Sequence, residues 1–483
     1  MASKPLSEWH RLHPASVGVN LIPQTWRFLR SMWPIILAAV AGRSTGGTRL
    51  DVPLLIFALL ATVGRTCMHF LTLRYRVTPE GLEIKNGWLN RQTRVLPPDR
   101  IQNVELVRNP FHRLSGLVEV RIETAAGEEV EGELSALSLA AGEHLVRTLK
   151  ERQGEQANTN PAQSPTGLSH LSTWDLFKFA ATSTRFGALL LFAGVAFEAL
   201  SGIDAEWVHT MGDRLSGSGV WILALTAITG SWLVGLGVTM NRHYGFTMER
   251  SGTRLIAQEG LLTTRRVELQ QSRIQLLVHH EPLLRRLAGF GSVWIDTAAM
   301  RRGAVAAARA EAFIPVVEHR KVDKLVASTL TEMDLEDAIS KLASPHPKAL
   351  TRARLGSLWK TLFVTLFIVW AFGAWGWLAP CVILPLEWLT TALDHAHQGW
   401  LVTESHIVTR SGYLNRRTHI IPRYRLQSTE VIQGPFLRRW ELGRLVVRIA
   451  GKGVPLPLVT LAQAQALQDQ LIHATPTSAK EAS

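Results

Sequence analysis

Cysteine is scarce in this chain of 483 residues, which has only two, Cys67 and Cys381, both in strongly apolar stretches. Two cysteines in such places allow no disulfide framework and no cysteine-based zinc site. The sequence also lacks a Walker loop, a Rossmann glycine fingerprint, a Gly-x-Ser-x-Gly elbow and a His-Glu-x-x-His metal motif. These absences predict a protein that is not an enzyme and that uses no cofactor and no metal.

Nucleic-acid-binding motifs are missing as well, although the net charge is +13. No helix-turn-helix, zinc finger or aromatic stacking motif accompanies this net charge, most of which lies in residues 242–330 and 397–474. A basic domain beside a membrane is attracted to anionic lipid headgroups. We therefore expect these basic residues to bind anionic lipid headgroups and not nucleic acid.

Long apolar runs, in contrast, are abundant. They occupy three blocks, residues 25–73, 184–241 and 358–396. One helical crossing needs about 20 mostly apolar residues, so each block is long enough for a hairpin of two crossings. The blocks predict about six transmembrane helices in a multi-pass α-helical membrane protein.

The distribution of Lys and Arg sets the expected orientation. Basic residues are frequent before residue 31 and after each apolar block, whereas the connector between residues 203 and 217 carries three acidic residues and one arginine. Cytoplasmic segments of membrane proteins carry the excess of Lys and Arg. Both termini and the water-facing segments are therefore expected on the cytoplasmic side.

A threefold repeat follows the apolar blocks, over residues 74–150, 242–330 and 397–474. Each copy has a turn glycine, an Arg-x-Gln motif thirteen residues later, and then a proline followed by arginine. The turn glycines are Gly87, Gly260 and Gly412; the prolines are Pro110, Pro282 and Pro435. Apolar residues alternate with polar ones between these landmarks, and each copy ends in a helical pattern. The repeat predicts an antiparallel β module closed by one C-terminal helix.

The remaining segments are polar. Residues 1–24 form an N-terminal segment, 151–183 and 331–357 are expected to be linkers, and 475–483 a disordered tail. Residues 151–170 lack any apolar period, which is typical of a flexible linker.

Helical hairpins followed by β modules with these landmarks, after an initial Arg11-Leu12-His13-Pro14, resemble the YdbT-like family of bacterial membrane proteins with pleckstrin-homology-like (PH-like) domains. The resemblance implies three α+β modules, each a bent β-sandwich or barrel capped by a helix, in the bacterial plasma (inner) membrane. It also implies a smaller one-module membrane protein of the same kind as partner, beside possible self-association. The middle copy departs from the pattern, with Gln270 where the others have Pro97 and Pro422.

Two sets of repeated polar residues are the candidate interaction sites. The first is the Arg-x-Gln motif, which we expect on a strand; its arginines could bind lipid phosphates with their planar fork, or hold backbone carbonyls in place. The second is the arginine that follows each proline, which could contact an anionic surface or be solvated or intramolecular. The two sets comprise Arg100, Gln102, Arg113, Arg273, Gln275, Arg285, Arg286, Arg425, Gln427, Arg438 and Arg439.

Together these features predict a non-enzymatic membrane scaffold that presents three cytoplasmic modules for protein assembly or for binding to the anionic membrane surface. The alternative is a transport or lipid-handling protein that uses the helices as a path, for which Arg65 and His69 are the main intramembrane candidates. The histidines of His279-His280-Glu281 and of His395 with His397 are interpreted as surface or interfacial residues, because their spacing does not match a known metal motif.

Overall fold

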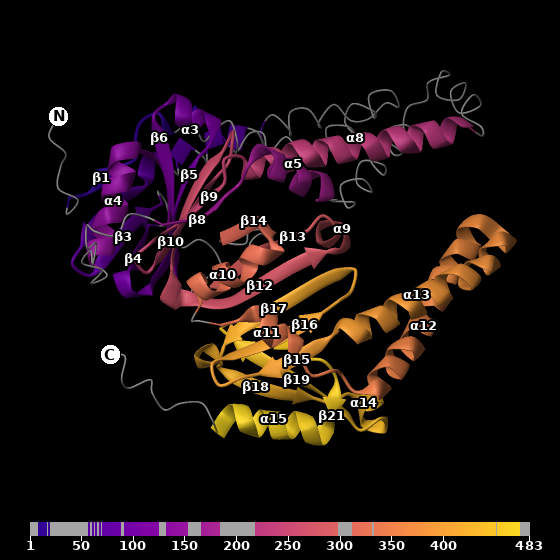
Figure 1. Cartoon of the computed structure of the whole chain (residues 1–483). Coiled ribbons are helices and arrows are strands. Elements are labelled where there is room, and N and C mark those ends of the chain that lie inside the picture. The colour runs from indigo at the N-terminus through magenta and orange to yellow at the C-terminus, as the bar shows by residue number, and fades with distance from the viewer. Residues whose placement is uncertain are drawn as a thin grey trace. The chain divides into compact units, whose positions relative to one another are not determined.

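The structure, a computed structural model, describes residues 8–16, 18–19, part of 57–72, 73–87, 91–124, 132–152, 166–183, 218–297, 312–330, 333–450 and 452–473. It has two compact units, residues 1–269 and 270–483 (Figure 1). The boundary falls inside the second repeat, so that strands from one repeat belong to both units. Each unit is described by itself.

The first unit contains two antiparallel sheets. One has four strands in the order β1-β2-β3-β4, and the other has seven in the order β7-β6-β5-β11-β10-β9-β8. The four are β1 (His10–Arg11), β2 (Arg74–Thr78), β3 (Gly81–Asn86) and β4 (Gln92–Leu96). The seven are β5 (Ile101–Arg108), β6 (Leu117–Thr124), β7 (Gly132–Ser138), β8 (Thr166–His170), β9 (Thr247–Ser251), β10 (Arg254–Glu259) and β11 (Thr264–Gln270).

In the described part of the first unit, helical elements with defined bounds accompany these sheets. They are η1 (Pro98–Arg100), α3 (Pro110–Leu114), α4 (Leu139–Arg152), α5 (Thr173–Thr182) and α8 (Ser218–His243). Alternating residues of β2 to β7 and one face of α4 form the core of the first module, with Leu82, Val118 and Leu145 fully buried. The side chains of a strand point alternately to its two faces. The apolar residues of each strand therefore face the core, and the polar residues between them face away from it.

The second unit also contains two main sheets. One has six strands in the order β14-β13-β12-β17-β16-β15, and the other has the path β18-β19-β20, with β21 paired to β19. Their strands are β12 (Ile274–Pro282), β13 (Phe290–Thr297), β14 (Ala312–Glu318), β15 (Gly399–Val402), β16 (His406–Ser411), β17 (Asn415–Pro422), β18 (Ser428–Ile432), β19 (Leu442–Ile449), β20 (Lys452–Pro455) and β21 (Val459–Thr460). Residues of β12, β16, β17, β19 and α15 share one core.

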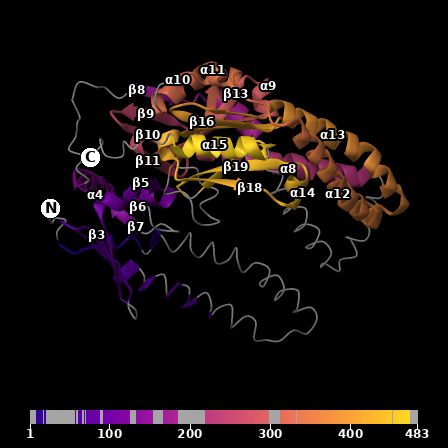
Figure 2. The same cartoon turned by 90° about the horizontal axis from the view of Figure 1, so that it is seen from below.

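The helical elements of this unit are η2 (Gln271–Arg273), α9 (Leu283–Leu287), α10 (His319–Thr329), α11 (Leu335–Ser340), α12 (Pro347–Phe372), η5 (Gly373–Leu378), α13 (Ala379–His397), η6 (Arg423–Arg425), α14 (Pro435–Arg439) and α15 (Leu461–His473). Helices α12 and α13 lie side by side as a hairpin that projects from the third module, and α15 lies along β18 and β19 (Figures 1 and 2).

The turn glycines adopt a backbone that other residues avoid. Gly87, Gly260 and Gly412 have φ of 103°, 109° and 79°. A Cβ at Gly412 would lie 2.5 Å from the carbonyl oxygen of Asn415, and one at Gly260 1.9 Å from that of Thr263. Glycine is therefore required there by both torsion and space, which explains why it recurs in all three copies.

The prediction of a six-span helical membrane protein is wrong as a fold class. The described residues form mostly β-sheet modules, and only two of their helices are long and apolar enough to cross a membrane, Pro347–Trp370 and Gly376–His397. An apolar run in the sequence predicts an apolar helix or strand, but it does not determine the class of the fold. That class follows from the β-sheet modules, which occupy most of the described chain. The predicted hairpin 25–73 and residues 184–217 of the second hairpin lie almost wholly outside the described residues.

Two stretches expected to be linkers contain regular structure. Residues 166–170 form β8, which pairs with β9, and α12 begins at Pro347, before the predicted start of the third hairpin. A strand thus precedes α8 and pairs with the strand after it, as β1 does with β2. In the third copy an isolated bridge between Ala343 and Trp400 does the same. The structural repeat therefore starts before each apolar block.

Candidate functional site: the joints between modules

The Arg-x-Gln arginines end short 3-10 helices and do not lie on strands as expected. Arg100, Arg273 and Arg425 are the last residues of η1, η2 and η6. Arg100 is exposed and Arg273 half-buried, while the guanidinium of Arg425 lies 4.8 Å from the ring centre of Tyr424. The aliphatic residue that follows is buried at Ile101 and Ile274. The motif therefore marks the start of a strand and leaves its arginines in three different environments.

The glutamines of this motif also differ. Gln275 is buried, and its Nε2 donates to the carbonyl of Arg273 at 3.5 Å. Gln427 is exposed, while its backbone N–H donates to Arg448 at 2.9 Å. The side chain of Gln102 lies outside the described residues. The structure does not bring the three Arg-x-Gln motifs together as one site.

The arginine after each proline has a consistent position in the short helix that follows the strand. Arg113, Arg286 and Arg438 are the penultimate residues of α3, α9 and α14. The equivalent in the second copy is therefore Arg286, one residue beyond the predicted Arg285. Arg285 is buried, donates to the Ser292 hydroxyl at 3.2 Å, and has a pKa lowered by burial to about 10.

Arg113 and Arg286 make the same contact with the following module. Nη1 of Arg113 donates to the carbonyl of Leu261 at 2.8 Å, and Nη1 of Arg286 to that of Tyr413 at 3.1 Å. Leu261 and Tyr413 each follow the turn glycine of the next module. Arg286 also lies over the Tyr413 ring, 4.8 Å from its centre. We call this contact the arginine clasp. Two of the three post-proline arginines thus bind protein, whereas Arg438 and Arg439 are exposed.

Strand pairing joins the same modules beside each clasp. β5 of the first module pairs with β11 of the second, and β12 of the second pairs with β17 of the third. The two joints have the same register. Leu106, six residues after Arg100, faces Arg266, seven residues before Arg273; His279, six after Arg273, faces Thr418, seven before Arg425. Consecutive modules are therefore fused into continuous sheets by one repeated joint.

Polar side chains reinforce the joints. Glu105 on β5 is buried and forms an ion pair with Arg265 on β11. At the other joint, the ring of His280 on β12 contacts the side-chain oxygen of Asn415 on β17. A charged pair with one partner buried gains strength from the low local dielectric, provided that both groups remain paired. These pairs help to fix which strands meet.

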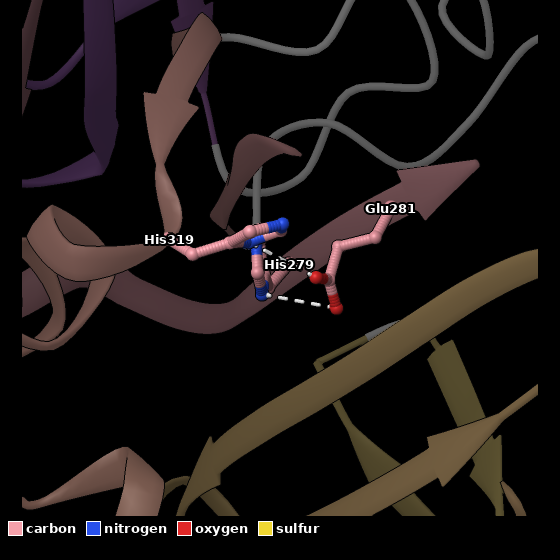
Figure 3. Close-up of side chains that lie close together, drawn as sticks. All are labelled: His279, Glu281 and His319. Carbon is pink, nitrogen blue, oxygen red and sulfur yellow. Dashed lines mark ion pairs between the residues drawn. The ribbon is translucent and has the colours of Figure 1, made fainter. Parts of the chain in front are cut away.

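A cluster of His279, Glu281 and His319 lies beside the second joint (Figure 3). The carboxylate oxygens of Glu281 lie 3.6 Å from Nδ1 of His279 and 3.2 Å from Nδ1 of His319. Burial lowers the pKa of His279 to about 4, despite the opposing effect of Glu281. Two imidazoles and a carboxylate are ligand types that zinc accepts, but pairing of the histidines with the carboxylate also accounts for the arrangement. His280, which the sequence grouped with His279, points to the joint instead.

A cavity of about 720 Å³ lies where the α12–α13 hairpin meets the third module. Trp359, Phe436 and Trp440 supply apolar walls, and Arg352 and Arg444 supply positive charge. Burial, and next the charge of Arg352, lower the pKa of Arg444. Within the described part of the chain, Nε of Arg352 is buried without a hydrogen-bond partner. The cavity therefore combines an apolar wall with two guanidinium groups, and the carboxylate of Asp394 also lines it.

Comparison with known proteins identifies these modules. A family model described as bacterial PH domain matches residues 27–153, 189–332 and 354–475, which is most of the chain. The chain belongs to the bacterial PH domain family. It is 22% identical to the transmembrane protein YdbT of Bacillus subtilis (strain 168) over 464 residues, which cover 90% of this chain and 92% of YdbT. No solved structure matches. The predicted resemblance is confirmed, and the protein is a membrane-associated protein of three bacterial PH modules.

Sequence reasoning found the clasp arginines but not their acceptors. Leu261 and Tyr413 could have been found, because each directly follows a repeated turn glycine. Glu105 and Arg265 carry only a partial repeated signal, since their counterparts are Glu430 and Arg417 in the third copy but Val278 in the second and Gln92 in the first. His319 has no histidine counterpart in the other copies. The strand pairing between modules was missed because each copy was treated as a closed unit.

Proposed function

We propose that this protein is a membrane scaffold whose bacterial PH modules serve protein assembly by strand pairing. The observation that supports this proposal most is the repeated joint, in which β5–β11 and β12–β17 pair in the same register beside matching arginine clasps. In the first two modules, the post-proline arginine already donates a hydrogen bond to the neighbouring module, so it is not free to bind a lipid headgroup. Protein assembly is therefore favoured over headgroup binding at these arginines.

The α12–α13 hairpin provides the attachment to the membrane in this proposal. Few of its side chains are buried, and Trp359, Phe363 and Trp370 are among the most exposed. Exposed apolar surface of this extent is typical of lipid contact. Basic residues precede α12, and such residues are typical of the cytoplasmic side of a membrane. They support a cytoplasmic position of the modules at the inner membrane.

A photoreactive amino acid at Ile432, an exposed residue of β18, tests the assembly role in the full-length protein in its own membrane. The matched control is the same amino acid at Lys321, which is exposed on α10. An assembly scaffold gives a defined protein adduct from position 432 that exceeds the control severalfold. Equal or absent protein adducts at both positions would contradict the proposal.

A second role, supported by the cavity at the base of the hairpin, is contact with an anionic phospholipid. Arg352 and Arg444 would bind the phosphate, and Phe436 and Trp359 would line the acyl chains. Native mass spectrometry of the protein in nanodiscs of phosphatidylglycerol or phosphatidylcholine tests this role. We expect retained phosphatidylglycerol, lost in Arg352→Gln with Arg444→Gln; equal retention of both lipids, or no effect of the variant, would refute it.

A further inference from the structure

The repeated joint has two halves, and the chain contains one unused copy of each. The donor half consists of the strand after the Arg-x-Gln motif and the short helix that carries the clasp arginine. The acceptor half consists of the strand before the motif and the turn glycine that precedes this strand. Among the described residues, β18 pairs only with β19, and β4 pairs only with β3. The donor half of the third module and the acceptor half of the first therefore have open strand edges.

The side chains at these edges differ in burial from their counterparts in the joints. Val95 on β4 is 44% exposed, whereas Ile420, at the same repeat position on the paired strand β17, is 0% exposed. Ile432 on β18 is 42% exposed, whereas Val107 on the paired strand β5 is 7% exposed. Each position thus carries a buried apolar residue in one of the two joints and an exposed apolar residue at the open edge; in the other joint the residues are Glu268 and His280. An exposed edge strand with apolar residues is a template for pairing with another chain.

We propose that β18 of one copy of this chain pairs antiparallel with β4 of a second copy and so repeats the joint between molecules. This inference rests on the assembly role proposed above and names its partner. The chain itself carries both halves of the interface, which is the reason to prefer a second copy over another protein. Because the donor and acceptor halves are different surfaces, the contact is head-to-tail and builds a ring or a filament.

The register of this pairing follows from the two existing joints. In both joints, the residue six positions after the motif arginine of one module faces the residue seven positions before the motif arginine of the next module. Counted from Arg425 and Arg100, this register places Val431 of one copy opposite Thr93 of the other. Glu430, at the repeat position of Glu105, then lies opposite Arg94, close enough for an ion pair; within the chain Glu105 pairs with Arg265 diagonally across the joint. Arg438, at the clasp position of α14, is exposed and would lie near Gly87 of the second copy.

Two existing contacts must be exchanged when the strands pair. Gln468 of α15 donates to the carbonyl of Thr429 at 3.2 Å, and Arg448 donates to Glu430 at 2.9 Å. The first is a single side-chain bond, and the second is a pair in which both side chains are about half exposed. Exposed pairs contribute little to stability. Backbone hydrogen bonds along the two edges replace them.

Disulfide cross-linking of the purified full-length chain tests the pairing. Two differently tagged copies, both with Cys67→Ser and Cys381→Ser, are reconstituted together; one carries Val431→Cys and the other Thr93→Cys. A bond between them can only link two molecules. The control replaces Thr93→Cys by Arg94→Cys, because a shift of one residue points the side chain to the other face of the sheet.

We expect roughly tenfold more mixed-tag dimer from the matched pair than from the shifted pair, since only the matched register brings the Cβ atoms together. Adding Ile432→Lys, which places a charge on the edge, should reduce the dimer without changing the circular dichroism spectrum of the protein. No dimer, or equal yields from both pairs, overturns the pairing of copies. If the photoreactive residue at position 432 still gives a defined adduct with a different protein, the assembly role stands and only the identity of the partner falls.

Discussion

The clasp made by Arg286 predicts a local effect of measurable size. A hydrogen bond from a charged donor contributes about 1.5–3 kcal/mol, and a cation–π contact about 0.5–1 kcal/mol at a partly exposed site. Arg286 makes both with Tyr413, at 3.1 Å and 4.8 Å. Because the guanidinium is only half-buried, we expect Arg286→Ala to lower the free energy of opening the β12–β17 joint by about 1.5 kcal/mol, roughly a tenfold change in the opening equilibrium.

Hydrogen exchange of the full-length protein in detergent measures this opening. Peptides that contain β12 and β17 should exchange roughly tenfold faster in Arg286→Ala, in proportion to the opening equilibrium, while peptides of β6 should not change. Arg438→Ala is the matched control, because Arg438 has the same position in α14 but is exposed. Equal exchange of β17 in the Arg286→Ala and Arg438→Ala proteins would refute the assignment of the clasp.

Three further predictions concern the same joints. Glu105→Gln removes the negative charge beside Arg265 and should speed the exchange of β11 by about tenfold, since loss of one partner leaves the other charge poorly solvated; unchanged exchange would show that the pair does not stabilise the joint. Gly412→Ala, at φ 79°, should cost about 1–3 kcal/mol of stability, seen as a lower Tm, whereas Gly434→Ala, where a Cβ meets nothing within 4 Å, should leave the Tm nearly unchanged. Burial lowers the pKa of His279 from 6.5 to about 4, so the unfolded chain binds more protons between these values. His279 should therefore account for a loss of about 2 kcal/mol from the β12–β17 joint between pH 7 and pH 5, and His279→Gln should reduce the dependence of hydrogen exchange on pH by this amount. His280 and His419, whose pKa burial also lowers to about 4, retain the remaining dependence.

The modules were predictable from the sequence because their local signals agree with the fold. The turn glycines recur where a positive φ is required, as at Gly260 and Gly412. The alternation in residues 117–124 places Val118, Val120 and Ile122 in the core, while Glu119 and Arg121 pair with each other on the other face of β6. The terminal helix of each copy is present as α4, α10 and α15. These signals act within a few residues, which is the range over which a single sequence is informative.

The joints were not predictable in the same way. Which strand lies beside β5 depends on a pairing with β11, more than 150 residues away, and the sequence of an edge strand resembles that of a paired one. Arg113 was among the predicted interaction residues, but its acceptor is a backbone carbonyl, which any residue supplies. In the second copy, the spacing from proline selected Arg285, because α9 begins directly after Pro282 and its penultimate residue is Arg286. The number of crossings failed for a different reason, since apolar length alone does not determine the class of a fold.

An intramolecular disulfide across the first joint tests most directly that consecutive modules share a sheet. In the chain with Cys67→Ser and Cys381→Ser, Leu106→Cys and Arg266→Cys stand opposite each other on β5 and β11. We predict that mild oxidation of the membrane-embedded protein closes this bond within one molecule, and that Leu106→Cys with Val267→Cys, shifted by one residue, does not form it. Failure of the matched pair, or equal closure of both pairs, would contradict the shared sheet and, with it, the account of these modules as a joined series.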